Sequence, residues 1–94
     1  ELETMFAEAI HQFDDHPLVI DVRNFGLMGA IELAPRQGAP GARGLDAHKH
    51  CFWDEDLVIR NGMDILQFSP FLNSKPADIH SMFDSVRRVL DKIT

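Results

Sequence analysis

The chain has 94 residues, 45% of them hydrophobic, and a formal net charge of -6 at pH 7. This length accommodates one domain with a small core, and the acidic balance excludes the basic face of a nucleic-acid binder or a polybasic membrane anchor. No apolar run approaches the roughly 20 residues of a membrane helix, and the single cysteine cannot form an internal disulfide, which predicts a cytoplasmic location.

The first part of the chain predicts a helix and then a strand. Apolar residues at helical spacing indicate an amphipathic helix over residues 2–13, and Pro17 disfavours its continuation. Residues 18–23 alternate as a strand does. That alternation predicts three apolar side chains on one face: Leu18, Ile20 and Val22. Because the chain opens inside a helical pattern without an initiator Met, we expect residues 1–94 to be a single domain of a longer protein.

A second strand and a loop follow. A turn at residues 24–26 connects the first strand to residues 27–33, which predicts an antiparallel hairpin. Gly29 and Ala30 in the second strand predict that a core helix or a neighbouring domain packs closely against the backbone. Residues 34–44 contain several glycines and prolines, which indicates a surface loop, and their spacing matches no phosphate-binding fingerprint.

Residues 45–53 predict a short helix. We expect its apolar face to consist of Leu45, Phe52 and Cys51. The acidic run at residues 54–56 opposes the helix dipole at the C-terminal end, which predicts a frayed and solvated terminus.

Two short strands come next. Residues 57–59 and 65–68 are rich in β-forming side chains, and Asn61-Gly62 between them is a hairpin-turn signal. Arg60 ends the first of these strands, at the lip of the sheet. Asp64 is a candidate structural partner for Arg60 across the hairpin.

The final helix begins at Pro76, after a connector at residues 71–76. An apolar stripe with a 3.6-residue period runs along it: Ile79, Met82, Phe83, Val86, Val89, Leu90 and Ile93. The order of elements is then helix, strand, strand, helix, strand, strand, helix. It predicts an α+β domain in which helices pack on one face of a small antiparallel sheet of three to four strands.

Three residues of the middle helix are candidate metal ligands: His48, His50 and Cys51. His48 and Cys51 have the three-residue spacing that lets two ligands share a metal ion, but solvated histidines beside a half-buried cysteine need no metal. Cys51 lies late in its helix, which favours an inert packing thiol over a nucleophile. The other histidines are scattered and predicted to lie on the surface: His11, His16 and His80.

Arg60 has two interpretations on spacing alone. An arginine after an apolar strand is commonly solvated or paired with a carboxylate of the protein. Alternatively, its planar guanidinium recognises a carboxylate or phosphate of a ligand through two parallel hydrogen bonds.

Three stretches then carry a family resemblance: residues 21–33 (DVRNFGLMGAIEL), 40–44 (PGARG) and 57–76 (LVIRNGMDILQFSPFLNSKP). In this order they resemble the C-terminal small domain of class III pyridoxal-phosphate-dependent aminotransferases. Among these, the chain is most similar to the β-alanine–pyruvate, or ω-amino acid–pyruvate, branch. The resemblance covers residues 18–92, most of the chain.

The resemblance implies a fold-type I enzyme whose small domain covers a large domain, with the active site between them at a homodimer interface. Arg60 stands at the position of the family's mobile arginine. The resemblance therefore implies that Arg60 binds the carboxylate of pyruvate or alanine and swings away for an amine that lacks one. The reaction implied for the whole enzyme transfers an amino group from an ω-amino acid or amine, such as β-alanine, to pyruvate.

In this family the lysine that holds pyridoxal 5'-phosphate belongs to the large domain. Lys49, Lys75 and Lys92 lie in no matching motif. The resemblance thus implies no catalytic or cofactor-binding residue in this chain, which we expect to be inactive and to bind the cofactor weakly or not at all by itself. We also expect no metal-binding residue, because His48 and Cys51 lack a second pair of ligands elsewhere.

Some positions depart from the family. Met63 and Ser69 stand where close relatives often have glycine, and residues 54–56 replace a glycine-containing helix end. These departures bear on which substrate the enzyme accepts more than on which family the chain resembles. The alternative is a free-standing α+β module that binds a small carboxylate or a second copy of itself, without catalysis.

Overall fold

The computed structural model describes residues 2–69 and 75–93. The elements in chain order are α1 (Leu2–His11), η1 (Gln12–Asp15), β1 (Val19–Phe25), β2 (Met28–Leu33), α2 (Ala42–Glu55), β3 (Arg60–Gly62), β4 (Ile65–Phe68) and α3 (Pro76–Lys92). The predicted α+β class and order of elements are confirmed. Within these residues no helix is long and apolar enough to cross a membrane.

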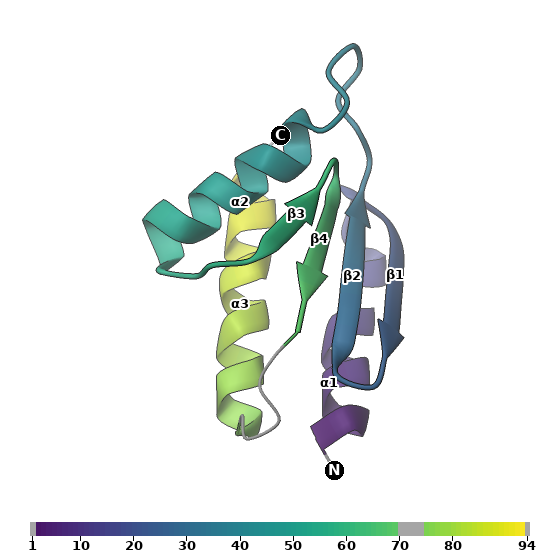
Figure 1. Ribbon diagram of the computed structural model, residues 1–94, viewed down its shortest axis with the longest axis vertical. Helices are drawn as coiled ribbons and strands as arrows, with labels where there is room; N and C mark the ends of the chain where they lie inside the picture. Colours follow the sequence, from purple (N-terminus) through teal and green to yellow (C-terminus); the bar gives the residue numbers. More distant parts are fainter. Residues whose placement is uncertain (1, 70–74, 94) are drawn as a thin grey trace.

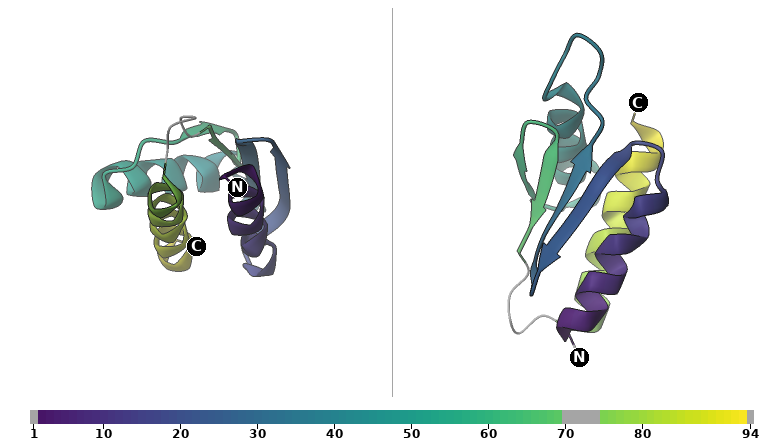
Figure 2. Two further views of the ribbon diagram at one scale, coloured as in Figure 1. Left: turned by 90° about the horizontal axis from the view of Figure 1, so that it is seen from below. Right: turned by 90° about the vertical axis from the view of Figure 1, so that its right-hand side faces the viewer.

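The four strands form one antiparallel sheet in the order β1-β2-β4-β3. Helices α1 and α3 lie side by side against one face of this sheet, as the three ribbon views agree (Figures 1 and 2). Helix α2 lies beside the β3 edge and packs against both α3 and β3. Among the described elements, none covers the opposite face, which is called the open face below.

The core lies between the sheet and the α1–α3 pair. The predicted apolar stripe of α3 is confirmed, since all its members are buried except Met82, which is half-buried. The Phe83 ring lies at its centre, with the ring centroids of Phe6, Phe13 and Phe68 at 5.6, 5.8 and 5.2 Å. Aromatic pairs at such spacing add to the burial of apolar area.

Gly29 explains how α1 comes so close to the sheet. A Cβ atom at this position would lie 2.4 Å from the Ile10 Cδ1 atom and 3.0 Å from the Phe6 ring. The close packing predicted from the small residues of β2 is therefore confirmed, and its partner is a helix of this chain.

Three predictions for the first half of the chain are wrong. Ile20 does not share a face with Val22, because the β1–β2 register shifts between Val19 and Asp21, and this bulge leaves Ile20 57% exposed. His16 is buried rather than superficial: its Nε2 donates to the Asp91 carboxylate at 2.9 Å. The α-helix predicted to Phe13 ends at His11 and continues as the 3₁₀ turn η1.

The predicted apolar face of α2 is wrong for Leu45 and Phe52 and confirmed for Cys51. Leu45 and Phe52 are each 45% exposed, whereas the face that packs inward consists of Gly44, Ala47 and Cys51. A Cβ atom at Gly44 would lie 2.1 Å from the Met63 carbonyl oxygen. The helix approaches the β3–β4 turn so closely that only small residues fit, which periodicity alone does not reveal. The helix also begins at Ala42, inside the predicted loop.

The acidic end of α2 is tied down rather than frayed. The Glu55 carboxylate accepts from the Arg88 guanidinium at 2.7 Å, and Asp54 accepts from Lys92 Nζ at 2.7 Å. These hydrogen bonds hold the pKa of both carboxyl groups below their ordinary values, with Arg88 the main cause for Glu55 and Lys92 for Asp54. The positive charges of Arg88 and Lys92 on α3 thus balance the negative charge at the C-terminal end of α2.

Candidate functional site

The hairpin that carries Arg60 turns at a different place from the one predicted. Its two-residue loop is Met63-Asp64, since Gly62 pairs with Ile65, and Asn61-Gly62 belongs to β3. Residues 57–59 precede the strand and form no part of it. Met63 adopts a left-handed backbone conformation, with a φ of 54°.

Asp64 explains this turn. Its carboxylate is 6% exposed and accepts from the backbone N–H groups of Gly41 and Gly44, both at 2.8 Å. The first N–H groups of a helix lack partners within the helix and favour a negative charge. Asp64 supplies a hydrogen-bond acceptor and a negative charge at the N-terminus of α2. Its carboxylate is therefore bound to α2, and the predicted pairing of Asp64 with Arg60 is wrong.

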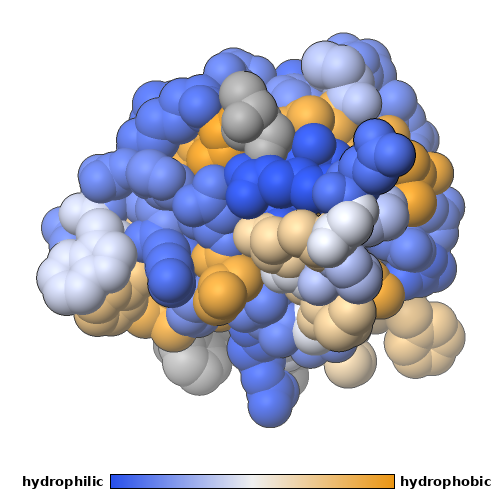
Figure 3. All heavy atoms as spheres, turned by 90° about the horizontal axis from the view of Figure 1, so that it is seen from above, coloured by the Kyte–Doolittle hydropathy of each residue, from blue (hydrophilic) through white to orange (hydrophobic). Residues whose placement is uncertain are grey.

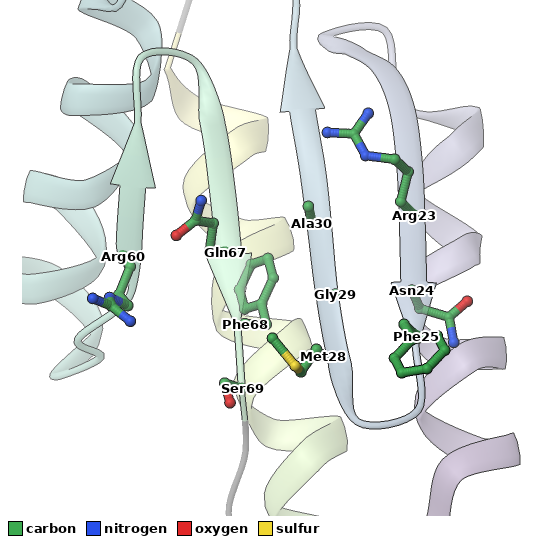
Figure 4. Close-up of a pocket in the computed structure, with 10 residues that line it drawn as sticks. All are labelled: Arg23, Asn24, Phe25, Met28, Gly29, Ala30, Arg60, Gln67, Phe68 and Ser69. Carbon is green, nitrogen blue, oxygen red and sulfur yellow. The ribbon is translucent and has the colours of Figure 1, made fainter.

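Arg60 belongs to a row of residues on the open face. The strand registers pair Arg60 with Gln67, Gln67 with Ala30, and Ala30 with Arg23. Because side chains on paired positions of neighbouring strands point to the same side of a sheet, this row runs across the whole open face from β3 to β1. Figure 4 shows these side chains on adjacent strands.

Arg23, at the β1 end of the row, is neutralised by its neighbours. Its Nη1 donates to the Asp21 carboxylate, two residues earlier on the same face, and to Glu32 Oε1 at 3.2 Å. The hydrogen bonds to Glu32 and then Asp21 raise the pKa of this guanidinium above its ordinary value.

Arg60, at the β3 end, has no acidic neighbour of this kind. The positions that flank it along and across the hairpin carry uncharged side chains: Val58, Gly62, Ile65, Gln67 and Ser69. Within the described part of the chain, no hydrogen bond or ion pair engages the exposed Arg60 side chain. In a chain of net charge -6, this leaves a cation whose charge is available to an external anion.

Two hollows meet at Arg60. One, of about 440 Å³, lies over the open face and is lined by Arg60, Gln67, Met28 and Phe25 among others (Figure 4). The other, of about 420 Å³, lies between the start of β3 and α3 and includes Val58, Met82 and the acidic Asp78, whose carboxylate accepts from the Lys75 N–H. Gln67, Phe68 and Ser69 border both, so the guanidinium lies where the two hollows adjoin.

Large apolar side chains are exposed both at the first hollow and elsewhere, on α2. Phe25 is 86% and Met28 is 61% exposed at the end of the β1–β2 hairpin. On α2, Trp53 is 76% exposed and its ring packs edge-on against Phe52 with centroids 4.9 Å apart. Seen from above, apolar side chains are interspersed with hydrophilic ones over the surface (Figure 3).

The candidate metal ligands of α2 have other partners. His48 Nδ1 lies 2.8 Å from the Ile59 carbonyl oxygen, and His50 lies between Asp46 and Asp54, with Nδ1 2.7 Å from the latter. Cys51 is fully buried, and burial raises the pKa of its thiol to about 11, with a smaller contribution from Glu55. An inert packing thiol, as predicted, follows from this environment.

The three lysines lie away from the hollow over the open face. Lys49 and Lys75 are exposed, and Lys92 binds Asp54. None of them lines either hollow at Arg60. Among the described residues, the two hollows at Arg60 therefore present no lysine amine to an aldehyde cofactor.

Sequence reasoning found Arg60 but missed its surroundings. The period-2 pattern of β4 would have placed Gln67 on the exposed face, since it lies between the buried Leu66 and Phe68. No local signal reports that Arg23 is neutralised by Glu32 from another strand, or that His48 reaches the residue before Arg60.

Known proteins resemble this chain closely over nearly all of its length. No protein-family model matches it. It is 43% identical over 93 residues to an omega-amino acid–pyruvate aminotransferase of Pseudomonas putida, and 44% identical over 92 residues to an omega-aminotransferase of Caulobacter vibrioides. These matches cover 99% and 98% of this chain but only 20% and 21% of the relatives, so the chain spans about a fifth of their length.

Solved structures that resemble this chain are also omega transaminases. A thermostable omega transaminase variant from Pseudomonas jessenii superposes with a TM-score of 0.90 over 99% of this chain and 22% of that one, at 27% identity. The omega transaminase of the same organism in complex with PMP gives a TM-score of 0.87 over 96% of this chain and 21% of that one, at 27% identity. The family resemblance inferred from the sequence is confirmed.

Proposed function

We infer that this chain is the small domain of an omega-amino acid–pyruvate type aminotransferase, and we propose that Arg60 supplies the site that binds the substrate's carboxylate. The inference rests on similarity over nearly the whole chain to about a fifth of such enzymes. The rest of the longer enzyme contributes the catalytic machinery and docks on the open face, and a second subunit completes the dimer.

The single observation that supports the arginine's role is the contrast along one row of the sheet. Arg23 is neutralised by two carboxylates, while the flanking positions of Arg60 are uncharged. A guanidinium with no internal partner presents its planar donors to a carboxylate in a bidentate fashion, which a lysine cannot reproduce.

The two hollows support a mobile role for the same side chain. In the hollow over the open face, the guanidinium meets a ligand that lies between this domain and the rest of the enzyme. When an apolar amine without a carboxylate occupies that space, the long side chain turns into the second hollow, which Val58, Met82 and the acidic Asp78 line. One pocket then serves two substrate classes, because the charge leaves when no anion is present to balance it.

The cofactor belongs to the remainder of the longer enzyme in this proposal. When bound there, pyridoxal phosphate supplies the electron sink for moving an amino group between substrates. The described residues of this chain offer the Arg60 side chain to the substrate, and no lysine beside it. We expect the isolated chain mixed with pyridoxal phosphate to show no stable aldimine absorbance.

The decisive experiment uses the full-length aminotransferase that contains this domain, with single-turnover half-reactions of separate donors. Arg60→Ala should reduce kcat/KM for L-alanine about 100-fold, the loss of a charged hydrogen-bonded pair, while 1-phenylethylamine changes less than about 3-fold. Single turnovers keep pyruvate out of the measurement, because pyruvate itself carries a carboxylate.

Arg23→Ala is the matched control, since it removes an arginine from the same row of the open face. Its effect on the two donors should be equal. Equal losses for both donors in Arg60→Ala would remove Arg60 from the carboxylate site.

A further inference from the structure

The backbone that leads into Arg60 is held from the side of β3 that faces away from β4. Helix α2 lies along that edge and contacts β3. His48 Nδ1 lies 2.8 Å from the carbonyl oxygen of Ile59, the residue immediately before Arg60. Because a carbonyl only accepts hydrogen bonds, Nδ1 carries the proton and donates it.

A second contact fixes the start of the same short segment. The Leu57 N–H donates to the Cys51 carbonyl oxygen at 2.9 Å, after Asp56 turns the chain with a left-handed φ of 53°. Ile59 itself is 5% exposed and packs into the core. The segment from Asp56 to Ile59 is thus tied to α2 at both ends, although it belongs to no strand.

The β-ladder does not supply this support. Pairing with β4 begins only at Arg60, opposite Gln67, and β3 is three residues long. Without His48, the Ile59 carbonyl loses this hydrogen bond, and the Arg60 backbone is held by its pairing with β4. A short edge strand of this kind has little resistance to fraying.

We propose that His48 is a positioning residue that aims Arg60 at the substrate carboxylate; this rests on the proposed function of Arg60. His48 touches neither substrate nor cofactor. It secures the point from which a long, unpartnered side chain extends, so that the side chain moves while its base stays fixed. Misplacement of a binding group by about 1 Å is sufficient to cost up to ~100-fold in rate, so a loose base is costly.

Three substitutions at His48 separate this role from general packing. In His48→Asn, the amide nitrogen lies the same number of bonds from Cα as Nδ1 does and keeps the donor. In His48→Gln, the amide lies one bond further and misses the carbonyl, and in His48→Ala no donor remains. His50→Ala is the matched control, because it removes an imidazole and its hydrogen bond from the same helix without contact to β3.

The experiment measures KM for two amino donors, L-alanine and 1-phenylethylamine, in the full-length enzyme and compares how much each substitution changes the two values. His48→Ala and His48→Gln should each raise KM for L-alanine about 5- to 10-fold and leave KM for 1-phenylethylamine within about 2-fold, because only the carboxylate depends on Arg60. His48→Asn should restore the L-alanine value to within about 2-fold of wild type, and His50→Ala should affect both donors equally.

Arg60→Ala, measured alongside, distinguishes the two proposals. If Arg60→Ala lacks donor selectivity, the proposed function fails. If Arg60→Ala is selective but His48→Asn and His48→Gln give the same KM for L-alanine, the positioning role of His48 is overturned while that of Arg60 stands. The Asn–Gln comparison decides the matter even if His48→Ala does not fold.

Discussion

Arg23 and Arg60 lie at opposite ends of one row on the open face, and they differ in their neighbours. Arg23, on β1, has Asp21 two positions earlier on its own strand and Glu32 diagonally across on β2. Arg60, on β3, has uncharged residues in the equivalent positions. The same residue type on the same surface is therefore a structural ion pair in one place and an available cation in the other.

The difference shows that the register of the sheet, rather than the presence of an arginine, makes a candidate anion site. The net charge of the chain is no guide, since acidic residues outnumber basic ones in total and both arginines belong to the same chain. What counts is which side chains the strand pairing brings to the flanking positions, where cross-strand contacts are closest. The predictions below change that pairing or one of its charges, and one of them tests an ion pair away from the sheet for comparison.

Asp64→Ala should have the largest effect, because it removes the anchor that sets the β3–β4 register against α2. The variant leaves two N–H groups of α2 without their charged acceptor, which should lower the free energy of unfolding by about 3 kcal/mol. Urea denaturation followed by circular dichroism measures this. Asp64→Asn, which keeps one acceptor oxygen, should lose less, and equal losses would contradict the proposed capping.

Gln67→Glu should convert the surroundings of Arg60 into those of Arg23. A carboxylate directly opposite the guanidinium competes with the substrate, so kcat/KM for L-alanine should fall about 10-fold while 1-phenylethylamine is spared. Gln37→Glu, which adds the same charge in the exposed loop between β2 and α2, is the control. A similar loss in both variants would point to net charge instead of position.

Glu55→Gln tests an ion pair between two helices, away from the open face. The Arg88 hydrogen bond lowers the pKa of Glu55 in the folded state, so its stabilising contribution is complete above the ordinary value of 4.5 and is lost as the pH falls through the lowered one. The melting temperature of Glu55→Gln should therefore lie a few degrees below wild type at neutral pH. The two curves should converge in acid, and a constant offset would exclude this linkage.

Glu32→Gln should have the smallest effect. It removes one of two acids from Arg23 on an exposed surface, where single ion pairs contribute little to stability. Asp21 still neutralises the guanidinium, so neither the melting temperature nor the KM for L-alanine should change measurably. A gain in carboxylate binding would show instead that Arg23 is also close to the substrate.

Local patterns predicted much of this fold. The α3 stripe, the β1–β2 hairpin and the close approach at Gly29 follow from spacing and residue size within short stretches. The position of the second hairpin turn could not be predicted in this way. Asn61-Gly62 is the stronger turn signal locally, but Asp64 binds N–H groups that lie 20 and 23 residues earlier, and this contact selects Met63-Asp64.

The same holds for the site. Three short motifs, at residues 21–33, 40–44 and 57–76, were sufficient to select the family and the arginine, because each motif is a continuous stretch of the chain. The row from Arg60 to Arg23 joins residues 37 positions apart, through three strand pairings whose register no single stretch encodes.

By itself, the sequence determined the helical stripe of α3, the class of the fold, its family resemblance and the chemical nature of the group at Arg60, since these are properties of neighbouring residues. Only the tertiary structure decided that Asp64 caps α2, that His48 holds Ile59, and that Arg60 rather than Arg23 has no acidic neighbour at the flanking positions of the sheet. Those outcomes depend on distant elements packing together, where hydrogen bonds and charges find partners that sequence proximity does not supply.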